Sequence, residues 1–238
     1  MNGLVFKASY ALCKALHKKG PQVMGREIAD IVEKHSIGAS AAALGVAWLP
    51  GAGSTAALAA CAGFVWSMYF RINSKIGVPL SKNIIKSVAT AIGTNLAAGA
   101  ASTVFFSTVL SLPCFLGLGN VAASAIMASV SFALTWSCGL VYLKVLTRFA
   151  EANVDFDTVD EDDLKAVADE VLAEEDIKEM MTQAKDQFKK AKARGVIRKG
   201  AKEIGLEEKT PRKRKTGSSA KRTAPAKSKT STRSRRKE

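Results

Sequence analysis

Positive side chains are the most distinctive chemical feature of this sequence, and they gather at its C-terminal end. Residues 209–238 hold 13 Lys and Arg against one acid, so they carry most of the formal net charge of +14. Such a run binds phosphates of nucleic acid by counterion release, and it attracts anionic lipid headgroups. It has no aromatic residue on which bases would stack. The candidate phosphate contacts are Lys209, Arg212, Lys213, Arg214, Lys215, Lys221, Arg222, Arg233, Arg235 and Arg236.

Two glycine-bounded stretches resemble phosphate-binding loops but lack the lysine in the place that such loops require. Gly20–Gly25 is followed by Arg26, and after Gly195–Gly200 the lysine, Lys202, comes one position late. Neither stretch follows a β-strand pattern, which a nucleotide-binding loop needs. The sequence therefore predicts no nucleotide cofactor.

Acidic, histidine and cysteine side chains also form no recognisable site. Asp155, Asp157 and Asp160 lack the glycine and the terminal glutamate of a calcium loop, so they indicate a solvated helix start. The two histidines and four cysteines have neither metal-ligand nor redox-pair spacing. We expect buried free thiols, a reducing compartment, no signal peptide, no metal and no enzymatic activity.

A long apolar block lies between Ser36 and Leu143. Only four of its 108 residues are charged, and all four are positive: Arg71, Lys75, Lys82 and Lys86. If the block enters a membrane from one side, every Lys and Arg of the chain stays on that side, as expected for the cytoplasmic face. The sequence therefore predicts a membrane protein with both termini on the cytoplasmic side, and these four cations determine that orientation.

Proline and glycine divide the block into two helical hairpins. A spanning helix needs about 20 apolar residues. Residues 87–112 and 121–143 reach this length, whereas 36–49 and 55–70 are shorter. A soluble bundle is the alternative, but its helices would need a polar face that the longer helices lack. The residues expected in the hairpin turns are Pro50, Gly51, Gly53, Pro113, Gly117 and Gly119.

Amphipathic and charged segments flank the block. We predict an all-α protein with amphipathic helices in 1–35, the apolar double hairpin in 36–151, and a charged cytosolic helical segment in 152–206. The polybasic tail, 207–238, cannot bury a core and is expected to be disordered. Three residues are predicted to start or end helices: Ser81 and Asp160 as N-caps, and Gly195 as a stop.

The block from Ile37 to Glu151 resembles an uncharacterised bacterial domain, found alone in predicted inner-membrane proteins or C-terminal to an Era-like GTPase domain. The resemblance rests on the break at Leu49–Ser54, the gap at Gly77–Lys82, the break at Leu112–Asn120 and the closing Tyr142–Glu151. It implies a helical membrane-associated module with no catalytic residues to transfer. A GTPase, if involved, would be a separate protein partner.

These observations favour a non-enzymatic anchor or scaffold at a membrane, with the tail bound to anionic lipid or to a protein partner. Two alternatives stay open. In one, the tail binds nucleic acid and the chain is a membrane-proximal tether. In the other, the chain is a hairpin-type pore-former. Homo-oligomerisation is compatible with each.

Overall fold

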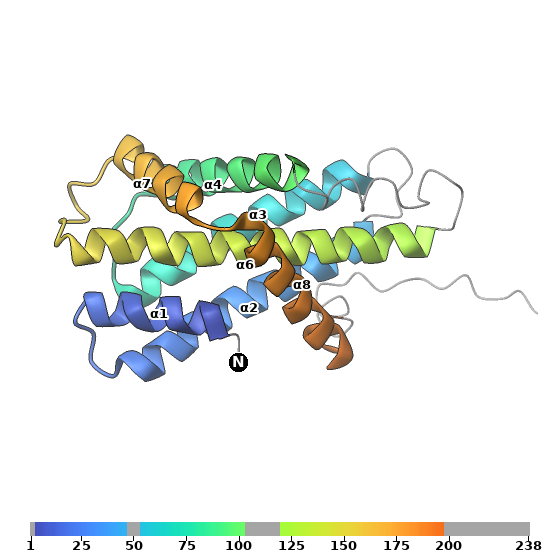
Figure 1. Cartoon of the computed structure of the whole chain (residues 1–238), viewed down its shortest axis with the longest axis horizontal. Coiled ribbons are helices and arrows are strands. Elements are labelled where there is room, and N and C mark those ends of the chain that lie inside the picture. Colours follow the sequence, from blue (N-terminus) through green and yellow to red (C-terminus); the bar gives the residue numbers. More distant parts are fainter. Residues whose placement is uncertain (1–2, 47–52, 103–119, 198–238) are drawn as a thin grey trace, which may run out of the picture. The chain divides into compact units, whose positions relative to one another are not determined.

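The computed structural model describes residues 3–46, 53–102 and 120–197, and their regular secondary structure is entirely helical. The prediction of an all-α protein is therefore confirmed for this part of the chain. All of these residues belong to one unit, Met1–Glu208. The helices are α1 (Gly3–Ala15), α2 (Pro21–Val46), α3 (Gly53–Ile76), α4 (Lys82–Ser102), α6 (Asn120–Glu151), α7 (Glu161–Glu174) and α8 (Ile177–Ala193) (Figure 1).

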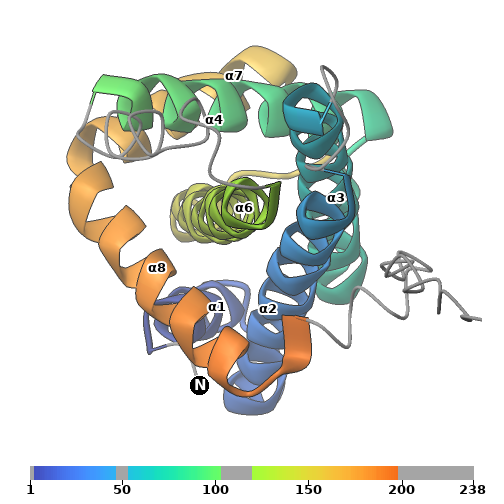
Figure 2. The ribbon, with the colours of Figure 1, turned by 90° about the vertical axis from the view of Figure 1, so that its right-hand side faces the viewer.

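Helix α6 lies at the centre, and the other described helices surround it (Figure 2). Within the described residues, Ala125–Glu151 is the one stretch long and apolar enough to cross a membrane. However, 83% of its most apolar window is buried by the rest of the protein. The part of this stretch from residue 125 to 143 is uncharged and needs an apolar environment on every side, which the neighbouring helices provide.

Small residues allow α6 to approach α2 and α3 closely. A Cβ placed on Gly139 of α6 would lie 2.8 Å from Val32 Cγ1 and 3.1 Å from Met68 Sδ. Polar side chains join α3 to α6 in the same layer: the Tyr69 hydroxyl donates to the carbonyl of Cys138 at 2.8 Å. This bond pairs a buried hydroxyl with a buried carbonyl, and it favours one register of α3 against α6.

Three helix ends follow the local sequence. Ser81 Oγ accepts from the amide of Ile84 at 3.3 Å, and Asp160 Oδ1 accepts from the amide of Asp163 at 2.8 Å. Gly195 has a φ of +69°, a left-handed conformation that glycine adopts without strain and that ends helices. The predicted caps and stop are thus confirmed.

The charged segment after Asp160 divides into two helices, α7 and α8. Glu175 is extended, with φ −85° and ψ 136°, and Asp176 caps a new helix by accepting from the amide of Glu179 at 3.0 Å. The break lets α7 pack on α4 while α8 crosses α6 in another direction (Figure 1). An amphipathic stripe shows that a face is buried, but it does not show how many neighbours bury it.

Helix α2 continues through Ser36, where the apolar block begins in the sequence. The Ser36 hydroxyl donates to the carbonyl of Val32 at 2.8 Å, so this buried serine is satisfied within its own helix. Of the predicted hairpin turns, Gly53 begins α3. The other turn residues, Pro50, Gly51, Pro113, Gly117 and Gly119, lie outside the described residues, as does the polybasic tail.

Candidate functional site

The four cations that interrupt the apolar block lie at one end of the hairpin formed by α3 and α4. Arg71 and Lys75 are in the last turns of α3, and Lys82 and Lys86 are in the first turns of α4; all four are exposed. Gly77 makes the reversal with a φ of +71°. The helix-turn-helix geometry therefore brings all four charges to the same end of the hairpin.

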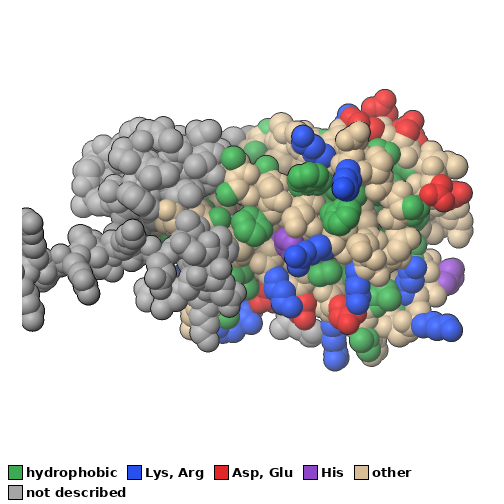
Figure 3. Space-filling model, turned by 180° about the vertical axis from the view of Figure 1, so that it is seen from behind, with side chains coloured by type: hydrophobic (Ala, Val, Ile, Leu, Met, Phe, Trp, Pro, Cys, Tyr) green, Lys and Arg blue, Asp and Glu red, His purple; other side chains and the backbone are tan. Residues whose placement is uncertain are grey.

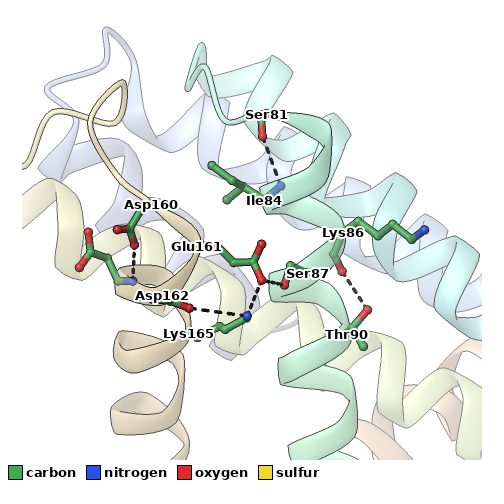
Figure 4. Close-up of polar contacts among 10 residues, drawn as sticks. Ser81, Ile84, Lys86, Ser87, Thr90, Asp160, Glu161, Asp162 and Lys165 are labelled. Atoms are coloured by element: carbon green, nitrogen blue, oxygen red, sulfur yellow. Dashed lines mark hydrogen bonds and ion pairs between the residues drawn. The ribbon is translucent and has the colours of Figure 1, made fainter.

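Most of these charges lack an acidic partner. Lys75 pairs with Glu27 of α2 at 2.8 Å. In the described parts of the chain, Arg71, Lys82 and Lys86 make no ion pair. Lys86 points away from the acidic residues of α7 (Figure 4). Positive charge without a local counterion attracts anionic groups from solution.

Two large aromatic side chains are exposed on α3 beside these cations. Trp66 is 41% and Phe70 47% exposed. They stand four residues apart, so they share one face of the helix, together with the exposed Ala59 and Ala62. We call Trp66, Phe70, Arg71, Lys82 and Lys86, with the small residues around them, the basic–aromatic face.

Sequence reasoning found the cations of this face but missed its aromatics. The four-residue spacing of Trp66 and Phe70, directly before Arg71, was the available signal. In an apolar helix that spacing looks like core packing, so exposure was not predictable. The α2–α3 side of the molecule lies opposite α8 (Figure 2), and there hydrophobic and basic side chains are interspersed (Figure 3).

Helix α7 covers the opposite side of α4 with acidic groups. Glu161 accepts from Ser87 Oγ of α4 and pairs with Lys165 (Figure 4). Further along, Asn95 Nδ2 of α4 donates to Asp169 Oδ1 of α7 at 2.6 Å. The bonds from Lys165 and Ser87 lower the pKa of Glu161 below its ordinary value. Glu161 and Asp169 are therefore engaged with α4, and within the described residues no acid of α7 forms an ion pair with Arg71, Lys82 or Lys86.

A hollow of about 380 Å³ lies where α1, α6 and α7 meet. Its lining includes the cations Lys7, Lys144 and Arg148, but also the acids Glu174 and Glu175. Lys144 binds Glu175, and Arg148 binds Glu174 and, at 3.4 Å, Glu170. Because these acids lie at the hollow and already pair with two of its three cations, it is the weaker candidate for an anion.

The acidic, histidine and cysteine side chains of the described residues form no metal-binding cluster. Within them, no three His, Cys, Asp or Glu side chains gather as metal ligands would. Asp155 and Asp157 are joined in a turn, by a 3.0 Å bond from the amide of Asp157 to Asp155 Oδ1, while Asp160 caps α7. The thiols of Cys13, Cys61 and Cys138 are free and buried, as predicted; Cys114 lies outside the described residues.

Comparison with known proteins adds no assignment. The chain matches no protein-family model, no curated protein and no solved structure. The resemblance to the bacterial hairpin domain therefore stays a prediction. The chemistry of the basic–aromatic face carries the functional argument.

Proposed function

We propose that this chain binds the surface of an anionic membrane through the basic–aromatic face and acts there as a non-enzymatic anchor or scaffold. The observation that carries this proposal is the exposure of Trp66 and Phe70 on α3, directly before Arg71. Lys82 and Lys86 are exposed at the start of the next helix, and within the described residues none of the three cations has an acidic partner. Aromatic rings favour the boundary between lipid headgroups and acyl chains, and nearby Lys and Arg favour anionic headgroups.

The magnitudes support reversible binding. Each cation near an anionic surface contributes about 1 kcal/mol. If each aromatic ring buries about 80 Å² on contact, each adds about 2 kcal/mol at about 25 cal/mol per Å². The gross attraction of this face is about 7 kcal/mol, so stable anchoring needs a second contact. The polybasic tail, with Arg212–Lys215 and Arg233–Arg236, is the second contact that we propose.

In this proposal the termini stay on the cytoplasmic side, and the charged helices α7 and α8 recruit protein partners. A separate GTPase, nucleic acid held by the tail, and a second copy of the chain are further candidate partners. A nucleic-acid tether predicts that duplex DNA retards the full chain in a gel shift. If DNA at physiological salt causes no retardation, the tether role is removed.

A pore-former is the second candidate, and the central helix favours it. Ala125–Glu151 is an apolar helix of spanning length that is held inside a shell of other helices. If those helices separate on a membrane, this helix enters the bilayer. Dye release from anionic vesicles on addition of the chain would support pore formation, whereas sealed vesicles carrying bound protein would support the anchor.

Vesicle flotation tests the anchor. We expect the full chain to float with vesicles of mixed phosphatidylglycerol and phosphatidylcholine, and to stay at the bottom with pure phosphatidylcholine. The double variant Trp66→Ser/Phe70→Ser removes both partly exposed rings and should weaken binding at least about tenfold. Val23→Ser is the matched control, because Val23 is 64% exposed on α2. Equal flotation of all three proteins would contradict the proposal.

A further inference from the structure

A hollow of about 400 Å³ lies between α2 and α3, beside the basic–aromatic face. Its lining carries positive and neutral polar groups, and no acid is among the lining residues. Lys34 and His35 come from α2, whereas Phe64, Ser67 and Arg71 come from α3. Segments more than 30 positions apart in the sequence thus bring two cations, an imidazole and a hydroxyl to one small site.

The floor of the hollow is rigid. His35 is only 6% exposed, and its Nδ1 is hydrogen-bonded to the carbonyl of Ile31 at 2.7 Å. The ring of Phe64 meets the imidazole edge-on, with centroids 6.5 Å apart and planes at 75°. A Cβ on Gly38 would lie 2.5 Å from Phe64, so this glycine allows the ring to sit where it does.

We propose that this hollow binds one phosphate group, held by Arg71 and Lys34 with the Ser67 hydroxyl as an additional donor. Guanidinium groups bind phosphate oxygens with two parallel bonds, and ammonium groups supply a compact positive charge. With Nδ1 of His35 engaged by Ile31, Nε2 is the ring nitrogen left for a ligand. Neither Lys34 nor Arg71 makes an ion pair within the described residues.

A phospholipid headgroup and a soluble phosphate ester offer the same chemistry. The headgroup is the source that position favours, because Ser67 and Arg71, which line the hollow, directly follow the exposed Trp66 and Phe70 on α3. This choice of source rests on the proposed membrane binding. The phosphate site itself does not, since it is built from Lys34, His35, Ser67 and Arg71 alone.

Occupation of the site should change the titration of His35. Burial lowers the pKa of His35, and the positive charge of Arg71 lowers it further, although the bond to Ile31 opposes them. The charged groups facing the ring are Lys34 of α2 and Arg71 of α3; α6 has no Asp, Glu, Lys, Arg or His between residues 120 and 143. A bound anion raises the pKa of His35, so by linkage it binds more tightly as the pH falls.

Proton NMR of the imidazole resonances tests this directly. The chain has two histidines; His17→Gln leaves His35 as the only reporter. The probes are glycerophosphoglycerol, a phosphodiester whose charge is constant from pH 5 to 8, and inorganic phosphate at pH 7. We expect the probe to shift the His35 resonance saturably and to raise its pKa. Arg71→Gln and Lys34→Gln should each weaken binding at least about tenfold, the effect of losing a charge-assisted hydrogen bond.

Lys82→Gln is the matched control, because it removes the same charge from the same end of the hairpin but outside the hollow. No response of His35 to either probe would overturn the site, as would equal weakening by Lys82→Gln. Tighter binding of glycerophosphoglycerol supports the lipid source, and tighter binding of inorganic phosphate supports a soluble ester. If the chain floats with vesicles but His35 does not respond, the phosphate site is wrong and the membrane anchor stands. If His35 responds but the chain does not float, the membrane anchor is wrong and the phosphate site stands.

Discussion

Replacement of Gly139 by alanine tests whether α6 is packed against protein or against lipid. In the structure, the new methyl group would lie 2.8 Å and 3.1 Å from the two γ-methyl groups of Val32 and 3.1 Å from Met68 Sδ. Val32 and Met68 are fully buried. Val32 is β-branched and has one favoured rotamer in a helix, so it cannot swing away without strain.

Two opposing contributions set the magnitude. Forcing an extra methyl group into a filled core costs typically about 1–3 kcal/mol. Alanine is about 1 kcal/mol more favourable than glycine inside a helix. The net expectation for Gly139→Ala is a loss of up to about 2 kcal/mol in the free energy of unfolding.

Urea unfolding followed by circular dichroism measures this difference, and Gly93→Ala is the control. Gly93 is in the interior of α4, and a Cβ there would have no neighbour within 4 Å. Gly93→Ala should therefore raise stability by about 0.5–1 kcal/mol. The two substitutions share the same chemistry, so their opposite signs isolate the packing of α6.

A Gly139→Ala protein more stable than the parent chain, as Gly93→Ala is expected to be, would refute the reasoning. It would mean that Val32 and Met68 do not enclose α6. The comparison should use midpoints at unchanged denaturant slope, because a changed slope would indicate a different folded or unfolded ensemble.

Two further predictions concern the contacts of α7 and the core hydrogen bonds. Lys165 and Ser87 lower the pKa of Glu161, and Arg148 lowers the pKa of Glu174. Both carboxylates therefore stabilise the fold at pH values above their unfolded pKa. This stabilisation is lost as the pH falls through the pKa values of the folded protein. Amide exchange in α7 should therefore speed up below about pH 4, relative to the intrinsic exchange rate at each pH, before exchange in α2 does; uniform exchange would contradict this. The Tyr142 hydroxyl donates to Asn73 Oδ1 at 2.8 Å inside the core. Tyr142→Phe leaves this buried acceptor unpaired, so it should lower the free energy of unfolding, measured with urea, by about 1–3 kcal/mol. An unchanged urea midpoint would show that the bond is absent.

Local features of the chain were predictable because they act over a few residues. The Ser81 and Asp160 caps depend on a side chain reaching an amide three positions ahead, and the stop at Gly195 depends on one φ angle. The break at Glu175 was not predictable in the same way. Asp176 has capping chemistry, but so do other acids of that segment, and packing against α4 and α6 decides where the helix divides.

The sequence by itself determined that the protein is helical, that its charges avoid residues 87–143, and that the cations of the block are grouped between Arg71 and Lys86. Tertiary structure alone decided that α6 is enclosed by other helices and that Trp66 and Phe70 are exposed. The physical reason is that an uncharged helix is equally compatible with lipid and with protein neighbours, since neither requires a polar face. The apolar sequence of α6 indicates that water is excluded from around it. Only the positions of the other helices show that protein, and not lipid, excludes the water.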